Sequence, residues 1–249
     1  AVSRPVANSR CHERLMQTIQ VNLKRMFPRK FVPQNADMGD WAQIEPLFKQ
    51  LLARHPASVQ ELEQWLADFS ELSAAYGEEG SARYIAMTTQ TDDPVREAAY
   101  QTFVEEIVPK IKPLAQEAEK AYLANPHRKQ LSAQRYSVLD RKSANSVALF
   151  REENVPLETQ DELLSKDYHK LMGVMTISVN GAELTLQQAA KVLEQPDRAL
   201  RQRVWEQMAG RRLKDKDALD EIYDKLVALR TKTAANAGFS NFRDLAFRQ

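Results

Sequence analysis

Apolar residues recur every three or four positions along most of this chain, and this spacing restricts what it can fold into. The clearest run marks one face of a helix and consists of Val59, Leu62, Leu66, Phe69, Leu72 and Tyr76. Ser58 with Glu61 forms a capping box in front of that run. Glycine occurs only seven times in 249 residues, whereas good helix formers are abundant. The pattern predicts a mostly α fold, a multi-helix lobe with antiparallel helical hairpins.

Start and stop signals position the first helices. Asp40 is a favourable N-cap for a helix over 41–53, in which Pro46 predicts a bend or a late start. Gly77 is expected either to end or to weaken the long helix of the first run. A further helical stretch follows over 81–88.

A second start signal combines Asp93 at the N-cap with Pro94 at the first helical position. Pro109 and Pro113 are expected to break the apolar face of this helix, and Pro113 can open the next helix through Tyr122. A short polar turn separates the helix that begins at Pro94 from the helix before it. The two should therefore pack as an antiparallel hairpin.

The second half of the chain has weaker helical signals. The segment 125–140 is polar and basic and is predicted to include a loop. Thr159 with Glu162 forms another capping box, for a helix that reaches Leu171. Further helices are predicted over 143–152, 197–212 and 215–237, with a stop at Asn236-Ala237-Gly238 and a last helix starting at Asn241.

Residues 175–184 follow a different pattern, because β-branched residues lie close to Asn180-Gly181. Asn-Gly is the strongest short-range signal for a tight hairpin turn. We therefore predict one small β-hairpin near residues 175–185, followed at once by a helix that Thr185 and Gln188 cap. Because isolated hairpins are marginally stable, this one must pack against helices or extend a sheet.

The formal net charge of +1 hides an asymmetry along the chain. Residues 1–30 hold seven basic groups and one acid, which leaves 28 basic against 33 acidic residues in the remainder. This basic leader is either a transit peptide or extra sequence ahead of an initiator at Met26. The densest basic run elsewhere, 211–214, leads directly into acidic residues, so no patch for nucleic acid is expected.

Cysteine content and hydropathy favour an intracellular chain. The single cysteine, Cys11, cannot form a disulfide within the chain, which argues for a reducing compartment. No stretch approaches the roughly 20 apolar residues of a membrane-spanning helix. We therefore expect a cytoplasmic protein with neither a membrane nor a nucleic acid as partner.

The sequence lacks the motifs that carry catalysis. It has no glycine cluster typical of a phosphate loop and no G-x-S-x-G elbow. His12-Glu13 begins like the zinc motif H-E-x-x-H, but Met16 occupies the last position. No histidine has another four residues later to share a metal on one helical face: His12, His55, His127 and His169. We assign no catalytic, cofactor-binding or metal-binding residue in this chain.

Two further features admit a functional and a structural interpretation. Adjacent glutamates at 78–79, 105–106 and 152–153 point in different directions on a helix, so they indicate solvated faces rather than acid/base pairs. An aromatic series suggests either a binding groove or, as its helical spacing favours, core packing: Trp65, Phe69, Tyr76, Tyr100 and Phe103.

Several segments resemble the N-terminal part of the oligoendopeptidase F family, zinc metallopeptidases related to thimet oligopeptidase. The first is Pro28-Arg29-Lys30-Phe31-Val32-Pro33 followed by Asp40-Trp41. The most specific is 229–244, which includes Ala235-Asn236-Ala237-Gly238-Phe239. The others are 91–94 with 103–107, 149–157 and 181–186 with 196–198. Their order and spacing carry the resemblance, which runs from about Pro28 to the end.

The resemblance implies a helical enzyme with two lobes around a deep channel that admits short peptides. Its zinc would be held by an H-E-x-x-H helix and a later glutamate, with the motif glutamate as general base. No position of this chain matches those residues. The resemblance therefore implies the N-terminal portion of a cytoplasmic zinc metalloendopeptidase, forming one wall of the channel and inactive alone. Zinc, the oligopeptide substrate and the missing catalytic lobe belong to the complete enzyme.

The same resemblance divides the chain into a leader over 1–25, an N-terminal lobe over 26–190, and the truncated start of the catalytic lobe over 191–249. An alternative is a non-catalytic helical binding or scaffold module, and a weaker third is a cryptic hydrolase. Apolar faces bearing Trp205, Leu226 and Phe242 are expected to need the missing lobe. They could instead cause self-association.

Overall fold

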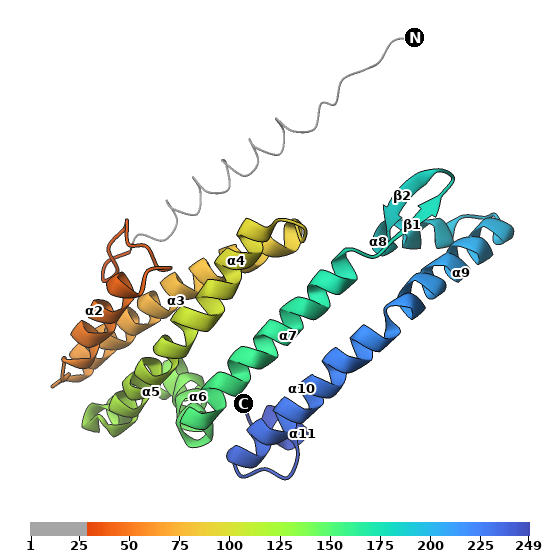
Figure 1. Cartoon of the computed structure of the whole chain (residues 1–249). Helices are drawn as coiled ribbons and strands as arrows, with labels where there is room; N and C mark the ends of the chain where they lie inside the picture. The colour runs from red at the N-terminus through yellow and green to blue at the C-terminus, as the bar shows by residue number, and fades with distance from the viewer. Residues whose placement is uncertain (1–28) are drawn as a thin grey trace.

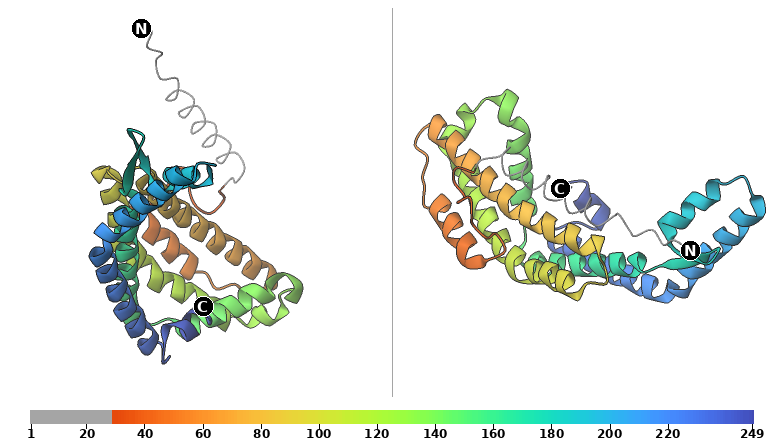
Figure 2. Two further views of the ribbon diagram at one scale, coloured as in Figure 1. Left: turned by 90° about the vertical axis from the view of Figure 1, so that its right-hand side faces the viewer. Right: turned by 90° about the horizontal axis from the view of Figure 1, so that it is seen from above.

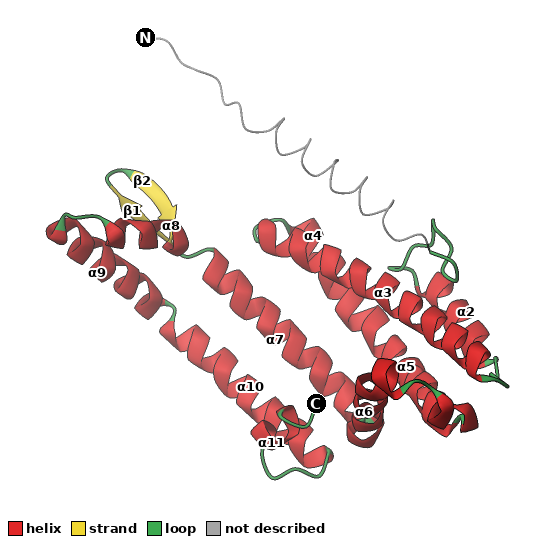
Figure 3. Cartoon of the chain, turned by 180° about the vertical axis from the view of Figure 1, so that it is seen from behind, coloured by secondary structure: helices red, strands yellow, loops and turns green. Residues whose placement is uncertain are grey.

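The computed structural model describes residues 29–249 and is almost entirely helical, as predicted (Figures 1 and 3). The predictions about the leader, Cys11, His12 and Met26 lie outside these residues. One two-stranded antiparallel sheet is the β structure of the described part. Figure 2 shows an elongated molecule, with the first helices at one end and the hairpin with α9 at the other.

The helices of the first half form one group. They are α2 (Trp41–Leu52), α3 (Val59–Thr89), α4 (Pro94–Thr102), the π-helical segment η1 (Phe103–Ile107), α5 (Val108–Ala124), the 3-10 helix η2 (Pro126–Gln130) and α6 (Ala133–Leu149). Asp40, Ser58 and Asp93 cap α2, α3 and α4 through their side chains, which confirms those three predicted starts.

The second half contains two long antiparallel helices and the hairpin. Its elements are η3 (Glu152–Asn154), α7 (Val155–Gly173), β1 (Thr176–Val179), β2 (Ala182–Thr185), α8 (Leu186–Ala190), η4 (Lys191–Glu194), α9 (Arg198–Lys214), α10 (Lys216–Asn236) and α11 (Phe242–Ala246). α7 and α10 lie side by side along most of their length, and α9 continues the line of α10 beyond Asp215 (Figure 1).

Helix α3 runs through Gly77 without interruption, so the expectation that this glycine might end the helix is wrong. A Cβ atom added at Gly77 would have no neighbouring atom within 4 Å. Gly80 differs, because a Cβ there would lie 2.9 Å from the Phe103 ring. The absence of a side chain at Gly80 lets α3 approach η1 closely, and the packing on both sides keeps the helix continuous.

The prolines after α4 widen the helix rather than end it, contrary to our expectation for Pro109 and Pro113. Helices α4 and α5 are joined without a loop through η1, where the Val108 N–H donates to the Phe103 carbonyl five residues earlier. Proline lacks an N–H and its ring crowds the carbonyl four residues before it. A π turn ahead of Pro109 relieves both problems, and Pro113 then lies inside α5.

Two predicted boundaries in the middle of the chain are wrong. Helix α6 already begins at Ala133, ten residues before the predicted start at Ser143, which is its one buried residue. Helix α7 begins at Val155, with Pro156 in its first turn, rather than at Thr159. The Thr159 hydroxyl donates to the Val155 carbonyl inside the helix at 3.0 Å, so it forms no capping box.

The main core lies between α2, α3 and the η1–α5 segment. Its largest side chains are fully buried, among them Phe48, Leu72 and Trp65. The aromatic series belongs to this core and its continuations: Trp65, Tyr100 and Phe103 are buried, and Phe69 and Tyr76 pack against them. The structural interpretation of the series is therefore confirmed.

The hairpin forms as predicted and supports a second core at the far end of the molecule. Asn180 and Gly181 both have positive φ, 53° and 83°, as a two-residue turn of this type requires. Met175, Ile177 and Val179 pack with residues of α8 and α9, including Val204 and Met208. This core contains residues from both sides of the predicted division at 190/191, and that division stays a prediction.

The predicted ends of the last helices are confirmed within two residues. Helix α10 stops in a Schellman motif, in which Gly238 has a φ of 84° and the Phe239 N–H donates to the Ala234 carbonyl at 2.9 Å. Asn241 then caps the short α11 through its side chain. Phe242 packs with Leu245 against Ala234 and is half-buried within the chain.

Candidate functional site

The three histidines that the structure describes lie on different elements. His55 follows α2, His127 lies in η2, and His169 is exposed on α7. The His169 ring meets Tyr84 and Tyr168 edge-on, with centroids 6.1 and 5.5 Å away. Over residues 29–249, no three His, Cys, Asp or Glu side chains are grouped so that they could hold a metal ion.

Three of the adjacent glutamates pair with separate cations. Glu78 bonds to Arg29 at 3.2 Å, and Glu79 accepts from Arg83 one turn later at 2.7 Å. Glu106 lies 3.9 Å from Lys110. Each glutamate of these pairs therefore acts on its own, as the solvated-face interpretation predicted.

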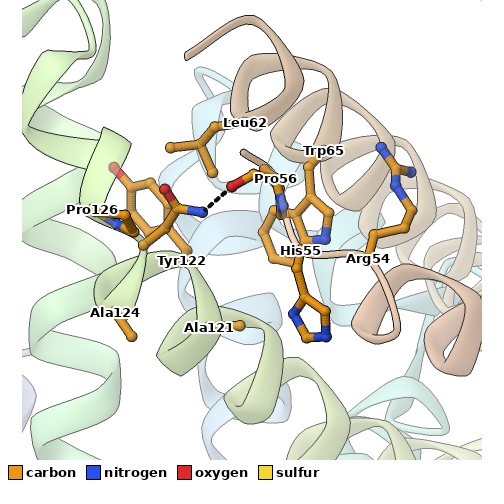
Figure 4. Close-up of a pocket in the computed structure, with 10 residues that line it drawn as sticks. Arg54, His55, Pro56, Leu62, Trp65, Ala121, Tyr122, Ala124 and Pro126 are labelled. Carbon is orange, nitrogen blue, oxygen red and sulfur yellow. Dashed lines mark hydrogen bonds between the residues drawn. The ribbon is translucent and has the colours of Figure 1, made fainter. Parts of the chain in front are cut away.

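A pocket of about 330 Å³ lies between the loop after α2 and the C-terminal end of α5 (Figure 4). Trp65 and Tyr122 line it, together with Pro56 from the loop after α2 and Pro126 at the start of η2. The Asn125 Nδ2 donates to the Pro56 carbonyl at 3.0 Å and ties these two segments together. The pocket is thus the seam between the start and the end of the first helical group.

The polar groups of Trp65 and Tyr122 at this seam are already paired. The Trp65 indole N–H donates to the Leu51 carbonyl at 2.9 Å, and the Tyr122 hydroxyl donates to Asp140 at 3.2 Å. Burial, with Asp140 beside it, raises the pKa of Tyr122 to about 12. Hydrogen bonding from Arg128 lowers the pKa of Asp140. Such groups hold the joint and leave no activated nucleophile.

A charged cluster fastens α7 to α4. Lys166 is only 7% exposed, and its ammonium lies 3.2 Å from Glu97 and 3.4 Å from the Gln101 side-chain oxygen. Lys170 donates to the other Glu97 oxygen at 2.7 Å. A buried ammonium is tolerated only with such partners, so the cluster fixes the position of α7 on α4.

A neighbouring contact strengthens the same joint. The Tyr100 hydroxyl of α4 donates to the Glu162 carboxylate of α7, and the Tyr84 ring packs on Tyr100 with centroids 5.6 Å apart. Burial raises the pKa of Tyr100 well above its ordinary value of 10.0, and the hydrogen bond to Glu162 adds to this effect. Tyr100 therefore stays a hydrogen-bond donor at neutral pH.

A second polar joint holds α10 against α7. Asn154 is 3% exposed; its Nδ2 donates to the Thr233 carbonyl at 3.0 Å, and its Oδ1 accepts from Asn236 at 2.7 Å. Arg151 also reaches the Asn236 carbonyl, at 3.2 Å. Nearby, Arg230 binds both carboxylate oxygens of Asp161, at 2.7 and 3.0 Å. The segments 149–157 and 229–244, both of which carry the family resemblance, meet here.

Sequence reasoning missed both polar joints. In the sequence, Asn154 stands out only as part of the segment 149–157, which resembles the oligoendopeptidase F family. Its partners lie 79 and 82 residues away. A possible signal was Pro156, which favours a helix start two residues after Asn154. The pairing itself depends on how α7 and α10 lie side by side.

Residues 31–150, which span α2 to α6, match the family model described as the peptidase M3 N-terminal domain. Residues 31–150 thus form a peptidase M3 N-terminal domain. The matched residues stop just before the Asn154 joint, so both sides of that joint lie in the part of the chain that follows. The Glu97 cluster is the contact that links the matched domain to α7.

Solved structures extend the likeness beyond the M3 N-terminal domain. An X-ray structure of an oligoendopeptidase F is 28% identical, with a TM-score of 0.79 over 88% of this chain. PZ peptidase A in complex with an inhibitor is 25% identical, with a TM-score of 0.78 over 90%. An oligoendopeptidase F from Bacillus anthracis, 24% identical with a TM-score of 0.79, shares the fold. No curated protein sequence matches the chain.

The chain spans about two fifths of the length of these structures, between 39% and 41%. The M3 family is typically metal-dependent, yet the part of this chain that the structure describes offers no fitting group of ligands. No helix within that part is both long and apolar enough to cross a bilayer.

Proposed function

We propose that this chain acts as the N-terminal portion of a zinc oligoendopeptidase that hydrolyses short peptides in the cytoplasm. The observation that carries the proposal is the match of residues 31–150 to the peptidase M3 N-terminal domain. The oligoendopeptidase F structure that is 28% identical supports it over a longer stretch.

The chain's own contribution would be structural. Helices α2 to α6 would form one wall of the channel that admits the peptide. Through the two polar joints, α7 and α10 would hold that wall in a fixed position. Because the described residues do not fit zinc, we derive no catalytic step from them. The metal and the general base would come from sequence outside this chain.

Peptide hydrolysis tests the proposal. The protein encoded by the complete reading frame should cleave short quenched-fluorescent peptides. It should not cleave folded proteins of the size of casein. Phenanthroline should abolish the activity, and added zinc should restore it. This chain alone should cleave nothing, with or without zinc.

Two outcomes would contradict the proposal. A reading frame without an H-E-x-x-H motif after Gln249 would favour the binding or scaffold module instead. Turnover by the purified chain alone, insensitive to phenanthroline, would favour a hydrolase within these residues.

A further inference from the structure

A second hollow of about 330 Å³ lies where α5, α6 and the start of α7 meet. This polar hollow is lined by Lys112, Ala115, Gln116, Glu119, Lys142, Ser146, Leu149, Phe150, Glu158 and Gln249. Its volume falls within the range of roughly 300–1,000 Å³ that is common for ligand pockets. It is separate from the seam of Figure 4, which involves the other end of α5.

Two facing helical stripes build the polar hollow. On α5, Lys112, Gln116 and Glu119 follow one another at intervals of four and three residues. On α6, Lys142 and Ser146 lie four residues apart and face them. Residues at these intervals share one face of a helix. Antiparallel helices normally bury apolar side chains between them, so a polar lining here is unusual.

Gln116 is the most informative member of the lining. Gln116 is 4% exposed, and among the buried side-chain nitrogen and oxygen atoms of residues 29–249 its Nε2 is the one without a hydrogen-bond partner. Leaving a buried donor unpaired destabilises the folded chain. An acceptor brought into the polar hollow by a ligand would remove that destabilisation.

The charges around the hollow balance. Lys112 pairs with Glu158 of α7. Burial raises the pKa of the Glu119 carboxyl above the ordinary value of 4.5, although Ser146 and the charge of Lys142 act in the opposite direction. Two cations and two carboxyl groups thus surround one unpaired amide donor. Such a lining repels neither sign of charge and complements a ligand that carries both.

We propose that the polar hollow binds a small α-amino zwitterion, a free amino acid or a dipeptide. The ligand carboxylate accepts from the Gln116 Nε2, and its ammonium group donates to Glu119. These two side chains are three residues apart on α5, where Cβ atoms are about 5–6 Å apart, a spacing that suits the two ends of a small zwitterion. Leu149 and Phe150 offer an apolar surface to the ligand side chain.

Calorimetric titration of the purified chain with defined probes tests this site directly. L-leucine and glycyl-L-leucine should bind saturably, and the tighter of the two identifies the amino acid or the dipeptide as the better ligand. N-acetyl-L-leucine amide, which keeps the side chain but has no charges, should bind at least tenfold more weakly. In nuclear magnetic resonance spectra, the side-chain amide signals of Gln116 should shift on binding.

Variants separate binding at the polar hollow from binding elsewhere. Gln116→Leu and Glu119→Gln should each weaken L-leucine or dipeptide binding at least tenfold, with an unchanged helical circular dichroism spectrum. Gln207→Leu, at an exposed position on α9, should leave the affinity unchanged. Having two lining variants keeps the test valid if one of them fails to fold.

The proposal is overturned if neither zwitterion binds, if the uncharged analogue binds equally well, or if the shifts occur only away from Gln116. Because the measurement needs no peptidase activity, it is independent of the proposed function. A failure of zwitterion binding would not affect the oligoendopeptidase proposal. A failure of peptide hydrolysis would likewise not affect the proposal for the polar hollow.

Discussion

Single polar side chains hold the loops and joints of this chain. The Glu71 carboxylate accepts the backbone N–H groups of Lys30, Phe31 and Val32, all within 2.8–2.9 Å. It thereby fixes the start of the described chain to α3, and Val32 becomes part of the main core. Asn154 does the same between α7 and α10. At both places a residue with several hydrogen-bonding atoms satisfies backbone groups of a distant segment.

Removing Asn154 should cost more stability than removing its partner. Asn154→Ala loses one buried and one partly buried hydrogen bond and leaves the Thr233 carbonyl without this donor, so we expect a loss of about 2 kcal/mol. Asn236→Ala removes one of the bonds and should cost about 1 kcal/mol. Urea unfolding at neutral pH measures both, and an equal or reversed order would contradict this account of the joint.

At the scale of elements, α3 offers a matched pair of glycines. Gly77→Ala should stabilise the chain by about 0.5–1 kcal/mol, because alanine favours helix and meets no neighbour. Gly80→Ala should destabilise it, because the new Cβ would lie 2.9 Å from Phe103 and α3 would have to shift. Thermal or urea unfolding of the two variants provides the comparison. Stabilisation by both would show that the close approach of α3 to η1 is unimportant.

The joint between α4 and α7 should weaken in acid. Hydrogen bonding from Lys170 lowers the pKa of Glu97 from 4.5, and Lys166 acts in the same direction. The folded chain therefore binds this proton less readily than the unfolded chain. The stability that Glu97 contributes is complete above pH 4.5 and is lost as the pH falls through the lower, folded value.

A urea-unfolding series from neutral pH into acid checks this sign. Glu97→Gln should be less stable than the parent chain at neutral pH, and the difference should shrink below pH 4.5. Glu106→Gln serves as control, because Glu106 lies 3.9 Å from its partner on an exposed face and should change little. A difference for Glu97→Gln that stays constant with pH would refute the assignment.

Helices and turns could be predicted where the sequence signal for them lies within a few neighbouring residues. The α3 stripe, the Asn180-Gly181 turn and the Asp93-Pro94 start each lie within a few residues, and all three were confirmed. Helix α6 buries only Ser143, so it has no apolar stripe to detect. The polar hollow was not predictable at all, since Gln116 lies unpaired only because α6 and α7 pack where they do.

At the scale of the whole molecule, burial is uneven. The first helical group encloses a continuous core, whereas the long line formed by α9 and α10 leaves several large apolar side chains exposed. The exposed fractions are 62% for Trp205, 68% for Leu213, 66% for Tyr223 and 46% for Val227. Leu226 is half-buried. Single exposed apolar residues are ordinary, but four on two consecutive helices make these helices a candidate interaction face.

We expect the purified chain to self-associate through α9 and α10. Burying these side chains against a second copy removes apolar area from water, at about 25 cal/mol per Å² before the costs of association. In sedimentation velocity, the average mass of the parent chain should therefore rise with protein concentration. Trp205→Gln and Tyr223→Gln should each reduce that rise. Ile85→Gln removes an equally exposed apolar residue from α3, 55% exposed, and should have no effect. A mass that stays monomeric at all concentrations, or an equal response to Ile85→Gln, would show that the α9–α10 face does not bind a second copy of the chain.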